Sequence, residues 1–299
     1  MTTTSLQEIN LSPVPAALPR PLTLRGRILR RMTGAVVVSI LLLIALLSVT
    51  IFAEVFAPHD PGLLNLRARL DPPGTPGHIF GTDQLGRDVL SRTIHGGRIS
   101  LLIGASSTVL GLLLGVGLGV LAGYGRGWLD EVILYLVDLQ LSLPFLLLAV
   151  AVALVLGDSL PVLIGLAALS TWPVYTRVCR GMVLSLRERD FVVAARAMGA
   201  GDRYIMLRHL LPNLVGPVMV LATLSVGRVI LLESGLSFLG IGVQSADYPT
   251  WGNMIGEGRE QLAAAWWIAT VPGVALVLLT MAIGTLGDWM RDLTDVSLG

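Results

Sequence analysis

Six long apolar runs, separated by shorter polar segments, dominate the pattern of hydrophobic and polar positions along this chain. A helix needs roughly 20 apolar residues to cross the hydrocarbon core of a bilayer. The pattern therefore predicts an all-α membrane protein with six transmembrane helices, at about 32–53, 99–125, 132–157, 159–176, 213–238 and 262–287. We expect two parts: a cytoplasmic N-terminal segment, residues 1–31, and a transmembrane domain, residues 32–299.

A basic segment lies between the fourth and fifth predicted spans. Residues 177–213 carry seven arginines, and their pattern predicts two short helices broken at Gly199-Ala200-Gly201. In the first helix, positions i, i+3, i+4 and i+7 form one apolar face, made of Phe191, Ala194, Ala195 and Met198. Gly199 is expected to end this helix in a left-handed conformation, and Asp202 to cap the second. The apolar side of the second helix is predicted to contain Tyr204, Leu207, Leu210 and Leu211.

The small side chains around this bend leave backbone exposed, so that a partner outside the lipid can fit closely against it. We therefore interpret the segment as a docking element. The alternative is an amphipathic helix that lies on the lipid surface, although such anchors usually carry more Trp, Phe and Leu.

Composition and charge support this arrangement and orient it. Only 14% of the residues are charged, against roughly 25% in soluble domains. With the N-terminus inside, the cytoplasmic pieces hold 14 arginines and the outer pieces 6, the bias expected of cytoplasmic loops. Both termini and the basic segment are therefore expected in the cytoplasm. All 21 basic residues are arginine, and the absence of lysine excludes a Walker A loop, which places a lysine on the nucleotide phosphates.

Two features inside the spans predict where helices pack closely and which residues line a water-filled path. Glycines four residues apart line one face of the second span, at Gly111, Gly115, Gly119 and Gly123, which favours close approach of another helix. Charged residues within spans usually face a bundle interior or a water path. The candidates are Asp138, Arg228 and Glu233; a passive place at the membrane interface is the alternative for each. Pro144 and Pro173 are candidate kinks.

Two polar stretches are predicted at the outer face. Gly81-Thr82-Asp83 and Gly86-Arg87-Asp88 alternate turn-forming residues with charges that can pair, so this segment can fold over an outer mouth. The Gly-rich stretch 235–261 carries Gln244 and Trp251 as candidates for a gate; a passive connector is the alternative.

The basic segment also resembles a known motif. Val193-Ala194-Ala195, then Gly199, then His209-Leu210-Leu211-Pro212 is similar to the EAA loop of ABC-importer permeases, with Val193 at the place of the family's Glu and His209 at that of its Ile. The resemblance implies that the loop, here 177–212, inserts a short coupling helix into a groove on an ATPase subunit. The contacts it implies are Ala194, Ala195, Arg196, Met198, Gly199, Ala200, Gly201 and Asp202.

Three further stretches narrow the family. Residues 80–92, 236–244 with 251–254, and 287–292 resemble the dipeptide/oligopeptide/nickel permease family, in its six-span C-type subunit. This implies the type I ABC-importer fold in a bacterial cytoplasmic (inner) membrane. It implies partners: a second homologous permease subunit, two ATP-binding subunits carrying ATP and Mg, an extracytoplasmic substrate-binding protein and lipid, with no nucleic acid. Cofactors and metals are not expected in this chain.

A transport subunit is the predicted function, and two other classes are its alternatives. The resemblance implies half of a translocation pathway that works by alternating access, with di- or oligopeptides as the expected solute and nickel chelates, glutathione or other small solutes as alternatives. An intramembrane enzyme would need polar catalytic groups at matched depth, and the spans offer few. A stand-alone channel or ion-coupled transporter would be expected to show inverted repeats, and none is evident in the sequence.

Overall fold

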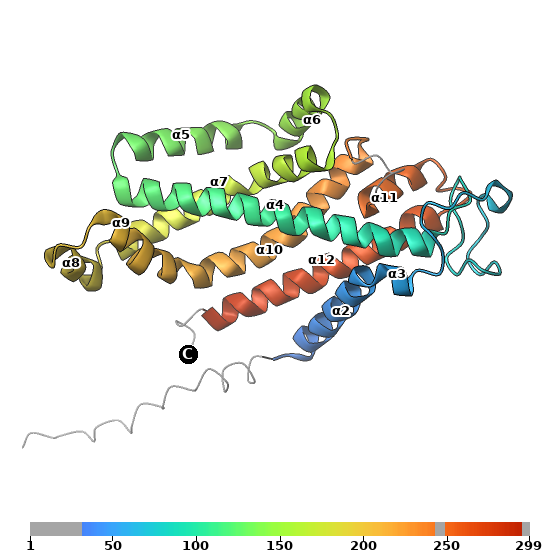
Figure 1. Cartoon of the computed structure of the whole chain (residues 1–299), viewed down its shortest axis with the longest axis horizontal. Helices are drawn as coiled ribbons and strands as arrows, with labels where there is room; N and C mark the ends of the chain where they lie inside the picture. The colour runs from blue at the N-terminus through green and yellow to red at the C-terminus, as the bar shows by residue number, and fades with distance from the viewer. Residues whose placement is uncertain (1–31, 243–248, 295–299) are drawn as a thin grey trace, which may run out of the picture.

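The architecture is an elongated helical bundle (Figure 1). The structure, a computed structural model, describes residues 32–242 and 249–294. Within these ranges there is no strand, only the isolated bridges Thr75–His78 and Thr82–Asp88. The predicted N-terminal segment 1–31 and the gate candidate Gln244 lie outside the described residues.

Five helical stretches are long and apolar enough to cross a membrane. They are α2 (Gly34–Ile51), α4 (Val89–Gly125), α7 (Leu160–Leu186), α10 (Leu211–Phe238) together with α9 (Asp202–Ile205) and the π-helical η2 (Met206–Leu210), and α12 (Trp267–Thr294). A sixth crossing results if α5 (Trp128–Ser142) and α6 (Phe145–Leu156) count as one bent span. The shorter elements are α3 (Ala53–Phe56), η1 (Leu66–Ala68), α8 (Asp190–Ala197) and α11 (Trp251–Arg259). The predicted all-α membrane architecture is confirmed.

The third predicted span, 132–157, is not a straight helix. Its two halves, α5 and α6, meet at an angle of 91°. Pro144 lies at the break, in an extended conformation, as the N-cap of α6. Proline lacks an amide hydrogen and disfavours helical backbone in the residue before it, so α5 ends at Ser142. Pro173, by contrast, lies inside the continuous helix α7.

Several helix ends differ from the hydropathy prediction. Helix α4 begins at Val89, not near residue 99, because Asp88 caps it by accepting a hydrogen bond from the Ser91 amide at 2.8 Å. Helix α7 continues to Leu186, so the polar loop predicted over 177–212 is shorter. Helix α12 begins at Trp267, later than predicted. A span predicted from hydropathy ends at the first charged residues. In the structure, charged side chains beyond those points have partners, and helices α4 and α7 continue through them.

The predicted glycine stripe of α4 is where α7 packs. A Cβ added at Gly115 would lie 2.5 Å from Tyr175 Cβ and 2.6 Å from the Trp172 carbonyl oxygen. At Gly119 it would lie 2.7 Å from Cys179 Cβ. Only glycine allows these backbones to approach so closely. Helix α4 also contacts α10, α2 and α12, and so occupies the centre of the bundle.

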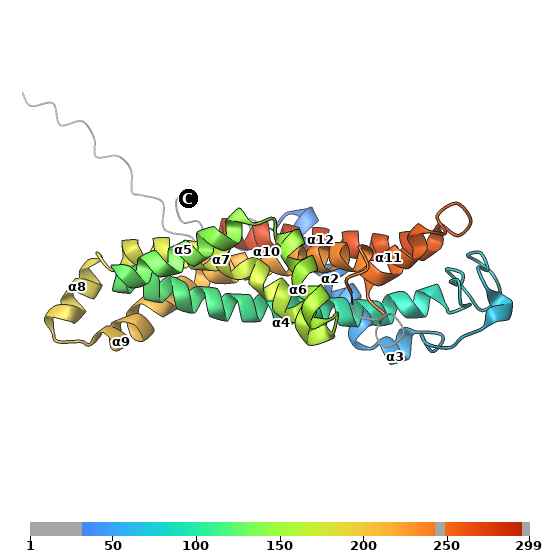
Figure 2. The ribbon, with the colours of Figure 1, turned by 90° about the horizontal axis from the view of Figure 1, so that it is seen from above.

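The two ends of the bundle carry different structures. Helices α8 and α9 lie together at one end of the long axis, whereas α11 and the loops that follow α3 lie at the other (Figures 1 and 2). Helix α4 alone, with 37 residues, is about 55 Å long at the usual rise per residue, longer than the roughly 30 Å hydrocarbon core. At least one end of the bundle therefore extends beyond the hydrocarbon core.

Candidate functional site

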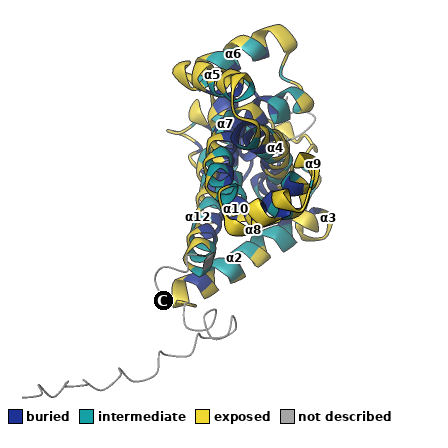
Figure 3. Cartoon of the chain, turned by 90° about the vertical axis from the view of Figure 1, so that its left-hand side faces the viewer, coloured by how far each residue is buried: buried dark blue, intermediate teal, exposed yellow. Residues whose placement is uncertain are grey.

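The bend between α8 and α9 forms an exposed tip at one end of the molecule (Figure 3). Gly199 has a φ of +85°, and its amide donates to the Arg196 carbonyl at 3.0 Å. The Ala200 amide donates to the Ala195 carbonyl at 3.1 Å. These bonds close the end of α8, and Gly199 has the left-handed conformation that the sequence predicts. Met198, beside it, is 82% exposed.

The predicted docking residues divide into a surface group and a buried group. The exposed ones are Ala194, Arg196, Met198, Gly199, Gly201 and Asp202. Ala195 is buried and Ala200 half-buried, so neither presents a full side-chain surface to a partner. Of the predicted apolar face, Phe191, Ala194 and Met198 are exposed and Ala195 is buried. Val192, which is not part of that face, is fully buried. The side of α8 that packs on the bundle is therefore Val192 and Ala195, and the larger apolar side chains remain free.

The base of the tip is embedded in a hydrophobic core. Val192, Ile205 and Leu210 are each fully buried there. Their cluster also contains Val120, Cys179, Val183, Leu214 and Val218, which belong to α4, α7 and α10. Of the four residues predicted to form the apolar side of the second helix, Leu210 is buried, whereas Tyr204, Leu207 and Leu211 are exposed. The π-helical turn explains the difference, because Ile205 and Leu210 are five residues apart and a π-turn places i and i+5 on one face.

A polar contact fastens the second half of the tip to α4. The Tyr124 hydroxyl donates to Asp202 Oδ1 at 2.6 Å. Asp202 is thus not the cap of α9; Gly201 occupies that position without a side-chain bond. Arg196 lies over the Tyr124 ring, 5.8 Å from its centroid, and its hydrogen bond to the Tyr124 hydroxyl raises the pKa of the guanidinium. Arg196 therefore remains cationic.

A second set of contacts fastens the first half of the tip. Arg126 Nη2 lies 3.1 Å from Glu188 Oε1, and Arg187 donates to the Tyr124 carbonyl at 3.0 Å. Both connect the start of the tip to the C-terminal end of α4. Sequence reasoning missed Tyr124 and Glu188 because their partners lie more than 60 positions away.

The charge predicted in the third span has a local partner. Asp138 of α5 is paired with Arg177 of α7, and both side chains are exposed. Nearer the α8 end, Asp130 accepts two hydrogen bonds from Arg180, at 2.6 and 2.7 Å. Asp138 therefore connects α5 to α7, and two arginines assigned to the basic loop lie on a spanning helix.

The charges predicted in the fifth span lie on different faces of α10. Glu233 is buried, and its Oε1 accepts a hydrogen bond from Ser237 at 2.8 Å. Arg228 is exposed, and it forms no ion pair with the described part of the chain. Trp251, a gate candidate, is instead buried against α4, where its Nε1 donates to the Thr93 carbonyl at 2.7 Å.

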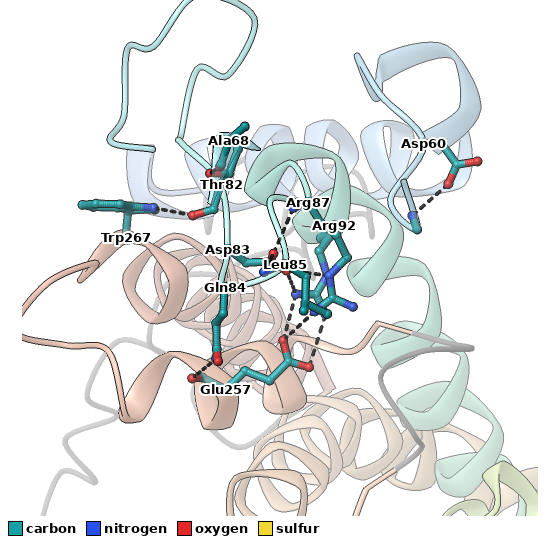
Figure 4. Close-up of polar contacts among 11 residues, drawn as sticks. Asp60, Ala68, Thr82, Asp83, Gln84, Leu85, Arg87, Arg92, Glu257 and Trp267 are labelled. Carbon is teal, nitrogen blue, oxygen red and sulfur yellow. Dashed lines mark hydrogen bonds and ion pairs between the residues drawn. The ribbon is translucent and has the colours of Figure 1, made fainter. Parts of the chain in front are cut away.

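The opposite end of the bundle contains a buried ion-pair cluster (Figure 4). Asp83 Oδ2 lies 2.6 Å from both Arg87 Nε and Arg92 Nη1. Glu257 of α11 completes it, with Oε2 2.8 Å from Arg92 Nη1 and 3.3 Å from Arg87 Nη2. The predicted pairing of charges in this segment is confirmed, and Glu257 joins the cluster from α11, a helix that was not predicted within the Gly-rich stretch 235–261.

The arrangement of the tip suits mechanical coupling to a partner better than catalysis. The tip is exposed, apolar at its apex and fixed at its base to three long helices. Among the described residues, one group of His, Cys and acidic side chains is close enough to share a metal ion: His59, His78 and Asp88. It lies at the α11 end of the bundle, far from the tip.

Comparisons with known proteins agree with this geometry. The sequence model of the family described as "Binding-protein-dependent transport system inner membrane component" matches residues 115–298. A di/tripeptide transport system permease protein of Pseudomonas aeruginosa is 40% identical over 264 residues, covering 87% of each chain. A dipeptide transport system permease protein of Alkalihalophilus pseudofirmus is 36% identical, covering 87% of this chain and 84% of its own. A glutathione transport system permease protein of Pectobacterium atrosepticum is 35% identical, with 86% and 85% covered.

A solved structure shares the fold. The inward-facing MetNI methionine ABC transporter includes a chain with a TM-score of 0.54 and 23% sequence identity. The match covers 68% of this chain and 96% of that one. The type I ABC-importer fold predicted from the sequence is thereby confirmed.

Proposed function

We propose that this chain forms half of the pathway of an ATP-driven peptide importer. The chain belongs to the family of binding-protein-dependent transport system inner membrane components, and the proposal starts from that membership. Its partners in this proposal are a second, homologous permease subunit, two ATP-binding subunits and an extracytoplasmic substrate-binding protein. In this proposal ATP and Mg bind to the ATPase subunits, where ATP is hydrolysed. Transport proceeds by alternating access.

The observation that carries the proposal is the tip with an exposed apex and a buried base. An ATPase subunit that grips Met198 and Phe191 would move Val192, Ile205 and Leu210, which share one core with α4, α7 and α10. Because α4 and α7 pack backbone to backbone along the glycine stripe, they would move together. ATP-driven closure of the ATPases would thus reach the spanning helices without an intervening flexible linker.

The orientation follows from the same element. The tip must lie in the cytoplasm to meet ATP-binding subunits, which agrees with the excess of arginines in the pieces on that side. Helix α12 runs back toward the tip end (Figure 1), which supports a cytoplasmic C-terminus. The α11 end would then face the substrate-binding protein outside the bacterial inner membrane.

Short peptides are the solute class best supported. Two of the relatives are named for dipeptides or tripeptides and one for glutathione, which is itself a tripeptide. All of these carry carboxylates. Arg228 is exposed on a spanning helix without an ion pair among the described residues. A cation at that depth is stabilised by a water-filled path or a neighbouring subunit rather than by lipid, so we place Arg228 on the pathway side of α10.

Reconstitution tests the proposal. The chain is assembled in proteoliposomes with its partner permease, ATPases and binding protein, and uptake of labelled dipeptide, glutathione and nickel is measured in parallel. We expect ATP-dependent uptake of the dipeptide. Uptake of glutathione alone would narrow the solute to that tripeptide, uptake of nickel alone would replace the peptide assignment, and ATP hydrolysis by this chain in isolation would contradict the proposal.

A matched pair of variants tests the coupling step. Met198→Ala removes the exposed side chain at the apex, whereas Met281→Ala removes an exposed methionine from α12. If Met198 occupies a groove on the ATPase, its truncation weakens association by about 2 kcal/mol, as for buried interface anchors, and reduces uptake correspondingly. Equal behaviour of the two variants would place the ATPase contact elsewhere.

A further inference from the structure

Two histidines and an aspartate from separate parts of the chain converge at the α11 end of the bundle. His59 follows α3, His78 lies in the loop segment between η1 and α4, and Asp88 caps α4. Their potential ligand atoms all lie within 4.8 Å of one another. His78 Nδ1 is 2.9 Å from Asp88 Oδ1, His59 Nδ1 is 3.9 Å from Asp88 Oδ2, and the two imidazole centroids are 4.9 Å apart.

The surrounding structure holds these groups in place. Asp88 Oδ2 accepts hydrogen bonds from the Ser91 amide at 2.8 Å and the Ser91 hydroxyl at 2.7 Å. The same hydroxyl accepts a hydrogen bond from the His59 amide at 3.0 Å. Asp88 is 2% exposed. One oxygen of the carboxylate is thus oriented by Ser91, as outer-sphere partners orient metal ligands, and the other is directed at His78.

One nitrogen in this cluster has no satisfactory protein partner. His59 Nδ1 is buried and makes no hydrogen bond within the described residues, because its distance to Asp88 exceeds a hydrogen bond. A buried polar atom without a partner is unfavourable. Two imidazoles and one carboxylate, whose potential ligand atoms lie within 4.8 Å of one another, form the ligand set of a zinc site with an open fourth position. Donor atoms in such a site are about 3.4 Å apart, which follows from zinc–nitrogen distances near 2.1 Å. On binding, the 2.9 Å contact between His78 and Asp88 would open slightly, and the donor atoms that now lie up to 4.8 Å apart would close toward the ion.

We propose that His59, His78 and Asp88 bind one divalent transition-metal ion of the zinc type. Bound there, the ion would connect the residues after α3 and the loop segment to the first turn of α4. This inference does not depend on which solute is transported or on the coupling role of the tip.

Zinc binding to the full chain, purified in detergent, tests the site. Zinc content is measured after dialysis against Zn²⁺, affinity by competition with a chromophoric chelator, and geometry from the visible spectrum of the Co²⁺-loaded chain. We expect one equivalent per chain. His59→Ala and His78→Ala should each weaken zinc binding more than about tenfold, since loss of an outer-sphere partner alone weakens binding 10- to 100-fold.

The controls separate ligation from folding. His95→Ala is the matched control, because His95 lies one turn beyond Ser91 on α4, where its Nδ1 is hydrogen-bonded to the Ser91 carbonyl at 3.0 Å. Asp88→Asn keeps a residue that caps helices well but removes the anionic ligand, so it should stay folded, bind zinc weakly and lose the thermal stabilisation by Zn²⁺. A wild-type chain without bound zinc, or equal affinity in the His59 and His95 variants, would overturn the proposal.

Discussion

Tyr124, at the end of the central helix α4, donates a 2.6 Å hydrogen bond to Asp202, the first residue of α9. This bond spans 78 positions of sequence and joins the tip to the helix that contacts most of the bundle. Together with the Arg126–Glu188 pair, it connects both halves of the tip to α4.

Replacing Tyr124 by Phe removes this bond and leaves the ring under Arg196. The bond is exposed to solvent, so we expect a loss of about 1 kcal/mol in the stability of the tip, with uptake reduced several-fold and folding intact. Tyr135→Phe is the control, because Tyr135 is an exposed tyrosine on α5. Parallel measurements of uptake and of thermal unfolding check this; unchanged uptake in the Tyr124 variant would show that the tip needs no tie to α4.

The glycine stripe on α4 provides a second pair of variants, one at a packed glycine and one at an open glycine. Alanine at position 115 would place a Cβ 2.6 Å from the Trp172 carbonyl, whereas alanine at position 117 meets nothing within 4 Å. We expect Gly115→Ala to destabilise the chain by about 1–3 kcal/mol through overpacking, and Gly117→Ala to be neutral or slightly stabilising. Thermal unfolding in detergent measures the difference, and equal melting temperatures would contradict the α4–α7 interface.

The ion-pair cluster predicts a large effect on stability. Asp83→Asn leaves two arginines, Arg87 and Arg92, without the buried carboxylate between them. Breaking a buried pair costs about 3–5 kcal/mol, and because Glu257 still pairs with both arginines, we expect a loss at the lower end, about 3 kcal/mol. Glu54→Gln, which removes an exposed acid 3.8 Å from Arg98, should change stability by no more than about 1 kcal/mol. If the two variants unfold at the same temperature, the cluster is solvated rather than buried.

Two glycine-to-serine substitutions test the bend between α8 and α9. Gly199 has a positive φ, whereas Gly201 has a φ of −70° and is the N-cap of α9; a Cβ at either would meet nothing within 4 Å. Gly199→Ser should therefore strain the backbone by about 1 kcal/mol and reduce uptake. Gly201→Ser should be tolerated, because serine is a good N-cap. A larger transport defect in Gly201→Ser than in Gly199→Ser would show that the bend acts through surface contact and not through the backbone conformation of Gly199.

Sequence alone determined the features that depend on local pattern. Hydropathy predicted the all-α fold and its spans, because a membrane requires long apolar helices. Glycine spacing predicted the close face of α4, and Gly199 the end of α8, because both follow from the missing side chain. Charge alternation predicted pairing in residues 81–88.

Tertiary structure decided what depends on partners distant in sequence. Arg92 meets Glu257, and Tyr124 meets Asp202, through folding that no local pattern encodes. It also placed Trp251 in the core and Asp138 beside Arg177, and it turned Val192 rather than Phe191 inward. The physical reason is that the energy of a charge or an apolar side chain depends on its surroundings, and those exist only once the helices have packed.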